Sequence, residues 1–242
     1  MPPRKPLLMI QAELVADTLP ELHAACGEAS DLILAGLGVD DRPLGTVAVW
    51  RDDPLPPIDS VSAVVVTGSS AMVADPLPWI GRTADFLRRA LEADVPTLGI
   101  CFGHQLLAHV AGGAVGPLPG KPEYATVEVR RTAAAADDPV LGHLPERFLA
   151  QGAHYQSVLI PPPGATIIAH GDSGIQAFRL GNAWGLQFHP EFDQPAMAII
   201  IEAIRDSLAD HGVDVEASLA ALAETPVASS VLGRFGAVVR AS

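Results

Sequence analysis

One segment decides the fold of this chain: residues 98–105 read Leu-Gly-Ile-Cys-Phe-Gly-His-Gln. The mostly apolar residues 96–100 predict a short buried strand, and residues 102–110 predict the helix that follows it. Cys101 therefore stands at a strand-to-helix turn, and the glycines two residues before and after it let the backbone fold back tightly. The free N–H groups and the dipole at a helix start favour the thiolate, the nucleophilic form of cysteine. We expect Cys101 to be a nucleophile.

A base for this nucleophile is available far downstream, where residues 184–191 read Trp-Gly-Leu-Gln-Phe-His-Pro-Glu. The segment predicts an apolar strand that stops at Pro190, because proline restricts the backbone. His189 can take up or hold the thiol proton, and Glu191 can orient the imidazole and stabilise its charge. The order Cys, His, Glu, with ~90 residues between the first two, fits side chains that meet only in the fold.

Together the two segments resemble the class I, or triad-type, glutamine amidotransferases. The resemblance is carried by Gly-x-Cys-x-Gly-x-Gln over residues 99–105 and by Gln-Phe-His-Pro-Glu over residues 187–191. It extends from about Leu7 to about Ala209 and is closest to the stand-alone branch related to the glutaminase domain of GMP synthase. It implies hydrolysis of the side-chain amide of glutamine through a cysteinyl thioester, with Cys101, His189 and Glu191 as the triad. It implies no metal and no organic cofactor.

The order of predicted elements indicates an α/β fold with an open, twisted, mostly parallel central sheet and helices on both faces. This is the flavodoxin-like arrangement that the resemblance also implies. Strands and helices alternate as far as residue 113, which is typical of a parallel sheet. After that, short strands between Gly and Pro turns predict a small antiparallel extension. We expect a single domain over residues 1–242, with a core over about 7–209 and a C-terminal helical extension over 210–242.

Several helices are predicted outside the segment around Cys101. Residues 18–37 predict one helix with Thr18 as its N-cap and Pro20 in its first turn. Residues 195–208 predict another, and residues 213–223 and 229–239 predict two short ones. These last two could cover the edge of the sheet or form a homodimer contact, and apolar spacing alone does not decide between the two.

Composition limits the class of protein and of partner. The chain has 242 residues, 49% of them hydrophobic, and a formal net charge of −13. Such acidity argues against nucleic acid and anionic membranes as partners, because both are polyanions. No apolar run is long enough to cross a membrane, and the run after Pro6 is too short for a secretory signal. Two cysteines give no disulfide framework, so we expect a protein of the reducing cytoplasm.

An oxyanion hole is predicted next to Cys101. Phe102, directly after the nucleophile, would offer one backbone N–H, and Gly68, at the end of a buried strand, would offer the second. Ser69 is the other candidate for this second donor. The family usually has Gly-Gly-Pro at this loop, whereas residues 67–70 here read Thr-Gly-Ser-Ser. The loop is therefore altered, but its backbone donors are kept.

The resemblance also implies residues that bind a small-molecule substrate. Gln105 lies one helical turn after Cys101 and would contact glutamine, the expected substrate. Backbone groups at Tyr155 and Gln156 would grip the amino acid end of glutamine, and Ser69 would contribute beside them. Glu123 either contacts the substrate amine or marks the boundary between a loop and a strand.

Three interpretations of the biological role stay open at this stage. In the first, which we favour, a glutaminase passes ammonia to an unassigned acceptor on a synthase partner chain, because the sequence contains no P-loop motif and too few residues after about 210 for a synthase. In the second, a stand-alone γ-glutamyl hydrolase or peptidase acts without a partner. In the third, the chain is a catalytically silent binding or regulatory module, and the three triad residues weigh against it.

Overall fold

The computed structural model describes residues 4–39 and 43–241. The strands are β1 (Leu7–Gln11), β2 (Leu44–Ala48), β3 (Ala63–Val66), β4 (Thr97–Ile100), β5 (Ala114–Pro117), β6 (Glu123–Arg131), β7 (Arg147–His154), β8 (Gln156–Ile160), β9 (Thr166–Gly171), β10 (Gly174–Leu180) and β11 (Ala183–Leu186). The α-helices are α1 (Val15–Thr18), α2 (Pro20–Cys26), α3 (Ala29–Leu37), α4 (Pro78–Glu92), α5 (Phe102–Val110), α6 (Gln194–Ala203), α7 (Arg205–Asp210), α8 (Val215–Ala220) and α9 (Pro226–Ala241).

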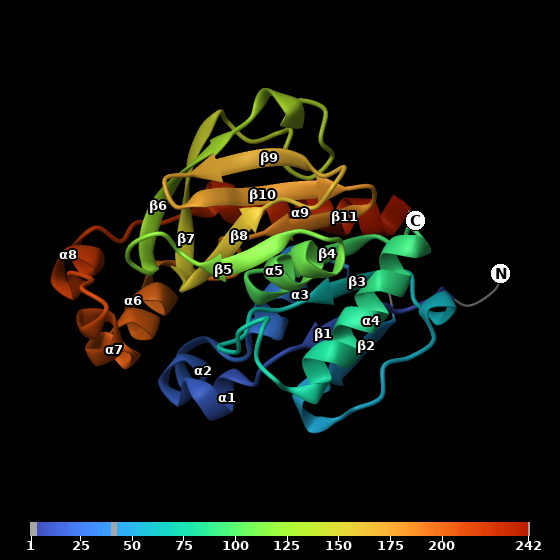
Figure 1. The fold of residues 1–242 in the computed structure, drawn as a ribbon, viewed down its shortest axis with the longest axis horizontal. Helices are drawn as coiled ribbons and strands as arrows, with labels where there is room; N and C mark the ends of the chain where they lie inside the picture. Colours follow the sequence, from blue (N-terminus) through green and yellow to red (C-terminus); the bar gives the residue numbers. More distant parts are fainter. Residues whose placement is uncertain (1–3, 40–42, 242) are drawn as a thin grey trace.

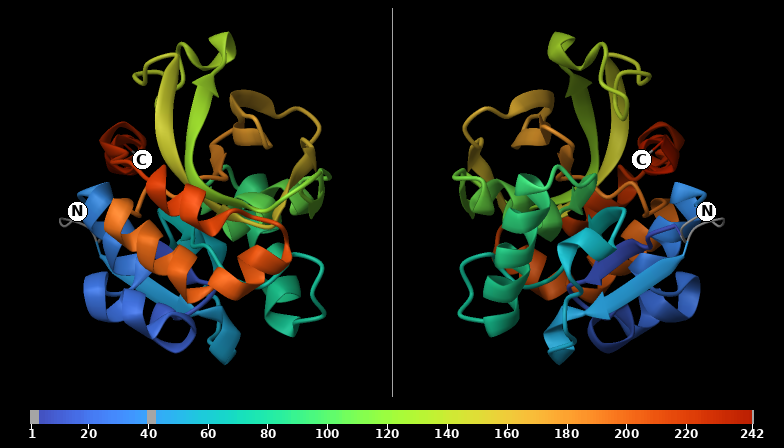
Figure 2. Two further views of the ribbon diagram at one scale, coloured as in Figure 1. Left: turned by 90° about the vertical axis from the view of Figure 1, so that its left-hand side faces the viewer. Right: turned by 90° about the vertical axis from the view of Figure 1, so that its right-hand side faces the viewer.

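The described strands form one large sheet and one small one. The large sheet has the order β2-β1-β3-β4-β11-β10-β9-β6-β7, and β5 pairs with β8 in the small one. The strands β2, β1, β3, β4 and β11 pair in parallel, whereas the pairs from β11 onward are antiparallel. Figure 2 shows β6 and β7 rising above the rest of the molecule. The predicted α/β class, with a parallel centre and an antiparallel part, is confirmed.

Helices cover both faces of the parallel half of the sheet. The helices α4 and α5 lie on one face, and α3 and α9 lie on the other (Figure 1). Along β1, Leu8 and Ile10 pack with the first pair of helices, and Leu7 and Met9 pack with the second. This alternation is typical of a strand that is buried on both sides. A third apolar cluster joins α1, α2, α6, α7 and α8.

The sequence predictions were wrong about two helices and missed one strand. The segment 18–37 forms part of three helices, and Thr18 ends α1 instead of capping a helix. Gly27 follows α2 with φ of 83°, a backbone conformation that ends a helix. The single helix predicted over 195–208 is divided at Ile204 into α6 and α7. The strand β8 was not predicted.

The C-terminal helices lie directly on the core. A Cβ on Gly236 of α9 would collide with the carbonyl of Leu37 at the end of α3, so the two helices are in close contact. The domain boundaries predicted from the sequence stay predictions.

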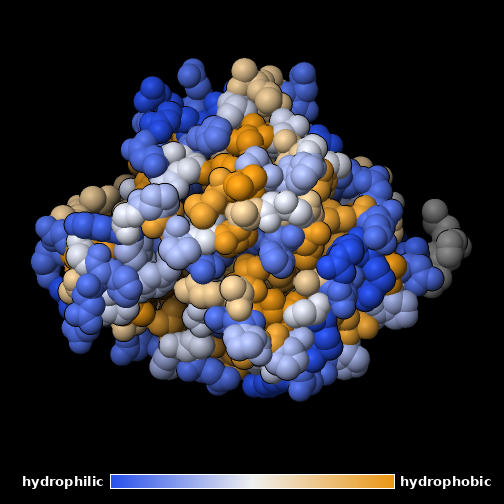
Figure 3. Space-filling view, viewed as in Figure 1, coloured by the Kyte–Doolittle hydropathy of each residue, from blue (hydrophilic) through white to orange (hydrophobic). Residues whose placement is uncertain are grey.

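Apolar residues gather on the middle of the face seen in Figure 3, and Leu159 and Ile160 of β8 are among the exposed large apolar side chains. No helix within the described residues is both long and apolar enough for a membrane crossing.

Candidate active site

Three neighbouring parallel strands bring distant residues to one edge of the sheet. Gly68 follows β3, Cys101 follows β4, and His189 follows β11, and these strands pair side by side. The carboxyl ends of such strands form the usual site crevice in open α/β sheets. A Cβ built on Gly68 would lie 3.1 Å from Cε1 of His189 and 3.7 Å from Cβ of Cys101. The structure therefore places the predicted nucleophile, base and oxyanion loop in contact.

The turn at Cys101 is strained, and glycines make it possible. Cys101 has φ of 49° and ψ of −100°, a conformation that residues other than glycine rarely adopt. A Cβ on Gly103 would lie 2.5 Å from the carbonyl oxygen of Val66, and one on Gly99 would collide with the backbone of Gly103. Only glycines let α5 start this close to β3 and β4. The turn leaves Cys101 6% exposed, at the wall of a cavity.

His189 and Glu191 form a buried pair beside the sulfur. Nδ1 of His189 lies 2.8 Å from Oε1 of Glu191, and their side chains are 7% and 1% exposed. Because a carboxylate only accepts, Nδ1 carries a hydrogen, and Nε2 remains for the sulfur of Cys101. Burial lowers the pKa of His189, but the charges of Glu191 and Cys101, with hydrogen bonds to both, raise it well above its usual value. His189 is thus built to carry a proton next to Cys101.

The loop after β3 is held by hydrogen bonds from its own side chains. Oγ1 of Thr67 accepts from the N–H of Ala12 at 3.0 Å and donates to the carbonyl of Gly68 at 3.0 Å. The hydroxyl of Ser69 donates to the carbonyl of Ala12 at 3.3 Å. Phe102 is the first residue of α5, so its N–H has no partner inside the helix. The backbone donors predicted for the oxyanion hole are therefore held on fixed elements.

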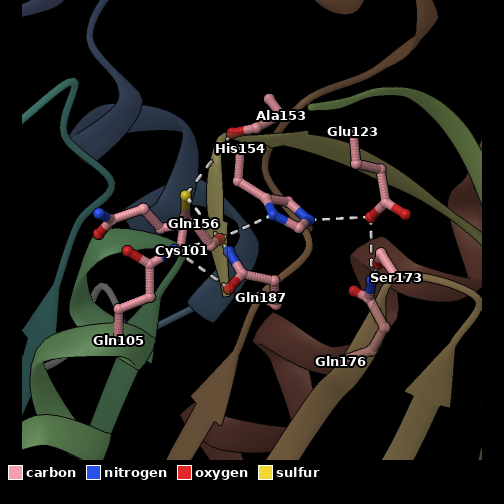
Figure 4. A network of polar contacts seen from close by, with 9 residues as sticks. All are labelled: Cys101, Gln105, Glu123, Ala153, His154, Gln156, Ser173, Gln176 and Gln187. Carbon is pink, nitrogen blue, oxygen red and sulfur yellow. Dashed lines mark hydrogen bonds and ion pairs between the residues drawn. The ribbon is translucent and has the colours of Figure 1, made fainter. Parts of the chain in front are cut away.

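A chain of buried polar contacts also reaches the sulfur (Figure 4). Nε2 of Gln187 donates to Sγ of Cys101 at 3.6 Å, and Oε1 of Gln187 accepts from Nε2 of Gln105 at 3.1 Å. Nε2 of Gln105 also donates to the backbone carbonyl of Gln156 at 2.8 Å, and Nδ1 of His154 donates to the same oxygen at 2.9 Å. The amide group of Gln105 therefore binds other groups of the protein, and one of them is the side chain of Gln187 that contacts the sulfur.

His154 continues these contacts to an acidic residue. Its Nε2 lies 2.9 Å from Oε1 of Glu123, which also accepts from Nε2 of Gln176 at 3.0 Å. Both ring nitrogens of His154 therefore lie against oxygen atoms, one of the carbonyl of Gln156 and one of the carboxylate of Glu123. Burial alone would raise the pKa of Glu123, but the hydrogen bond and charge of His154 bring it below its usual value. Glu123 is the first residue of β6. It takes part in these hydrogen bonds and does not line the cavity in front of Cys101.

A cavity of about 350 Å³ opens in front of Cys101. Its lining includes Gly68, Ser69, His189 and the ring of Tyr124. Tyr155 lies behind that ring, with the two ring centroids 5.3 Å apart, and its hydroxyl lies 3.0 Å from Oγ of Ser207. Of the residues predicted to bind substrate, Ser69 therefore lines the cavity, whereas Gln105, Tyr155 and Gln156 lie behind its wall. Across the described ranges, no three His, Cys, Asp or Glu side chains gather as metal ligands would.

Comparison with known proteins identifies the family. The family model for glutamine amidotransferase class-I matches residues 42–201. This chain belongs to the class I glutamine amidotransferases. One relative, a subunit of the glutamine-hydrolyzing GMP synthase of Ignicoccus hospitalis, is 43% identical over 99 residues, which are 40% of this chain and 50% of that relative. The corresponding protein of Sulfurisphaera tokodaii is 32% identical over 151 residues, which are 61% of this chain and 77% of that one.

The coverage of these relatives is partial, whereas the fold matches throughout. The chain spans 24% of the GMP synthase of Aeropyrum pernix and about half the length of the Ignicoccus relative. A crystal structure of a glutamine amidotransferase from Thermotoga maritima superposes with a TM-score of 0.77 at 22% identity, over 99% of both chains. One from Methylobacillus flagellatus superposes with a TM-score of 0.70 at 25% identity, over 98% of this chain and 93% of that one. The fold of this amidotransferase is thus that of other members.

Several side chains of this amidotransferase site were not predicted from the sequence. Gln187 was quoted within its motif but given no role, although it lies two residues before His189. β11 ends at Leu186, so strand alternation does not place Gln187, and its contact with the sulfur follows from the fold. Thr67, Tyr124 and Phe192 were also missed. Thr67 binds the N–H of Ala12 and Tyr124 packs on Tyr155, both from distant segments, whereas Phe192 stacks on His189 only three residues away.

Proposed function

We propose that this amidotransferase hydrolyses the γ-amide of glutamine, or of a γ-glutamyl compound, through a thioester on Cys101. The observation that supports this most is the 2.8 Å hydrogen bond between Glu191 and His189, with both residues and Cys101 at the wall of one cavity. The sulfur attacks the γ-carbonyl carbon, and the N–H groups of Gly68 and Phe102 hold the negative charge that develops on the oxygen. His189 then gives a proton to the leaving nitrogen, and the C–N bond breaks.

Water completes the proposed reaction. It gives a proton to His189, attacks the thioester carbon and releases a carboxylic acid together with the free thiol. Glu191 keeps the imidazole in one orientation and stabilises its charge in both halves of the reaction. None of these steps calls on a metal or an organic cofactor.

The released nitrogen is the second part of the proposal. The relatives from Ignicoccus and Sulfurisphaera are named as subunits of a glutamine-hydrolyzing synthase. By analogy, we propose that ammonia made at Cys101 passes to an acceptor bound by a synthase partner chain. A stand-alone γ-glutamyl hydrolase is the second candidate, and the apolar lining of the cavity favours it.

The purified chain tests the chemistry directly. We expect it to release glutamate from glutamine or from γ-glutamyl amides, and we expect Cys101→Ala to lower turnover by about 10³-fold or more. Cys26→Ala, on α2 and outside the cavity lining, is the matched control and should keep its activity. Thermal unfolding shows whether each variant is folded. Near-normal turnover by a folded Cys101→Ala protein would contradict the mechanism.

A further inference from the structure

One wall of the cavity in front of Cys101 is apolar. Val15 and Leu22 reach it from α1 and α2, Phe192 from the segment after β11, Ile200 from α6, and Ile204 from the position between α6 and α7. At about 350 Å³, the cavity falls within the ~300–1,000 Å³ of sites that enclose drug-sized ligands. The amide nitrogen of glutamine carries only hydrogens. With glutamine bound, no group on this nitrogen covers the apolar wall, so the wall stays exposed to water. Such an apolar wall is suited to a larger, apolar group.

The proposed chemistry fixes which half of the substrate meets this wall. His189 gives its proton to the leaving nitrogen, so that nitrogen lies within hydrogen-bond reach of the imidazole. The ring of Phe192 stacks on this imidazole, with centroids 4.9 Å apart and planes 21° from parallel. Any group attached to the leaving nitrogen therefore starts beside Phe192 and continues toward Ile200 and Ile204.

The charged residues around the cavity indicate the chemistry of the group attached to the leaving nitrogen. Among the described residues that line it, the acidic ones are Glu13 and Glu191, and none is a lysine or arginine. Glu191 is paired with His189, and Glu13 accepts from the backbone N–H of Ser70 at 2.6 Å. A leaving group with a carboxylate, such as an amino acid, would enter a cavity whose lining has two carboxylates and no lysine or arginine to pair with it. An uncharged alkyl or aryl group meets no such repulsion.

We propose that the substrate is the γ-glutamyl amide of an apolar amine, whose alkyl or aryl group packs against Phe192 and the wall formed by α1, α2 and α6. This inference rests on the proposed thioester chemistry and takes up its second candidate, the stand-alone γ-glutamyl hydrolase, in place of ammonia transfer to a synthase. The sulfur forms a bond to the γ-carbonyl carbon, the bond from that carbon to the substituted nitrogen breaks, and the nitrogen takes the proton of His189. A primary amine leaves in place of ammonia, and water hydrolyses the thioester as before.

A series of amides tests the proposal on the intact chain. We compare kcat/KM for glutamine, γ-glutamylmethylamide, γ-glutamylpropylamide and γ-glutamyl-β-alanine, with glutamate and amine release measured by mass spectrometry. Each buried methylene should raise kcat/KM about fourfold. The propylamide should therefore exceed glutamine by more than about tenfold. It should also exceed the β-alanine amide by a similar factor, since the two share a carbon chain and differ in the terminal carboxylate.

A pair of variants checks where the alkyl group binds. Ile204→Ala removes methyl groups from the wall, and we expect the ratio of kcat/KM for the propylamide to that for glutamine to fall by about fivefold or more. Leu77→Ala removes a similar volume from an exposed position outside the cavity lining, and the ratio should stay at the wild-type value.

The possible results separate this inference from the function on which it rests. If glutamine is hydrolysed with a kcat/KM equal to or above that of the propylamide, the apolar leaving group is refuted and the thioester chemistry stands. A preference for γ-glutamyl-β-alanine over the propylamide refutes the inference in the same way. If no amide is hydrolysed and a glutamine-like electrophile does not label Cys101, the proposed function and the inference fail together.

Discussion

Replacing Glu191 by glutamine tests whether a carboxylate charge keeps the proton on His189. Glutamine has nearly the same shape and can still accept a hydrogen bond from Nδ1, but it is neutral. In the native protein, Oε1 of Glu191 lies 2.8 Å from Nδ1, and the carboxylate is 1% exposed, so solvent hardly screens its charge. Burial works to lower the pKa of His189, and Glu191 is the largest of the contributions that raise it. Without the charge, the pKa of His189 falls.

The size of the effect follows from the burial of the pair. Leaving one member of a buried ion pair uncompensated costs about 3–5 kcal/mol. If this energy is lost where His189 carries the proton in the transition state, kcat/KM falls by about 10²–10⁴-fold, since each 1.36 kcal/mol is tenfold. The loss grows as the pH rises, because an imidazole with a lower pKa gives up its proton at a lower pH. The alkaline limb of the pH profile should therefore move to lower pH.

Replacing Glu191 by glutamine should also lower the free energy of unfolding, by an amount that depends on pH. A pKa that is raised in the folded state stabilises the protein fully below the unfolded value of about 6.5, and this contribution is lost as the pH rises through the folded value. The difference in the free energy of unfolding between the native protein and Glu191→Gln is therefore expected to be largest near about pH 6 and to shrink in alkali.

The assay is kcat/KM for the best γ-glutamyl substrate from about pH 5.5 to about 9.5, together with urea unfolding at both ends of this range. Glu128→Gln, at an exposed position of β6, is the control for a lost surface charge and should behave as the native protein. A folded Glu191→Gln protein with kcat/KM within about threefold of native and an unmoved alkaline limb would refute the role given to this carboxylate.

Two more changes test how the nucleophile is supported. Gln187→Leu removes the N–H donor that lies 3.6 Å from Sγ of Cys101. We expect kcat to fall by about tenfold with a smaller change in KM, and iodoacetamide should alkylate Cys101 more slowly at neutral pH; an unchanged alkylation rate would speak against the contact. Gly103→Ala places a Cβ 2.5 Å from the carbonyl oxygen of Val66, and we expect a loss of about 1–3 kcal/mol or more in calorimetric unfolding. Gly81→Ala on α4, where nothing lies within 4 Å of the added Cβ, should not destabilise the protein.

Elements that depend on local patterns could be predicted from the sequence. The bounds predicted for α5, residues 102–110, are the observed ones, because a strand, a tight glycine turn and an apolar helix follow one another directly. β3, whose residues Ala-Val-Val-Val are all buried, ends just before the loop of Gly68, where the sequence predicts the end of a buried strand. The glycines around Cys101 indicated a sharp turn, and the φ of 49° at Cys101 is the physical form of that turn.

Elements that depend on distant pairing could not be predicted. The strand β8 lacks a clear alternation, since Leu159 and Ile160 are both exposed, and it is fixed by pairing with β5 more than thirty residues earlier. The same holds for the contacts behind the nucleophile. Gln105 meets Gln187 across 82 positions and the carbonyl of Gln156 across 51. Such contacts follow from the register of the whole sheet, which no local pattern contains.

Two buried histidines near Cys101 show what selects the base. His104 lies three residues from Cys101 on α5, and His189 comes from another strand, yet only His189 has its pKa raised. Burial lowers the pKa of His104 to about 3, so it stays neutral where it packs on Phe178 at 4.9 Å between ring centroids. His189 is equally buried, and burial acts on it in the same direction. The carboxylate of Glu191 reverses the direction of the pKa shift at His189. Closeness in sequence or burial alone therefore does not make a histidine carry a proton next to Cys101. The buried acidic partner of His189 does.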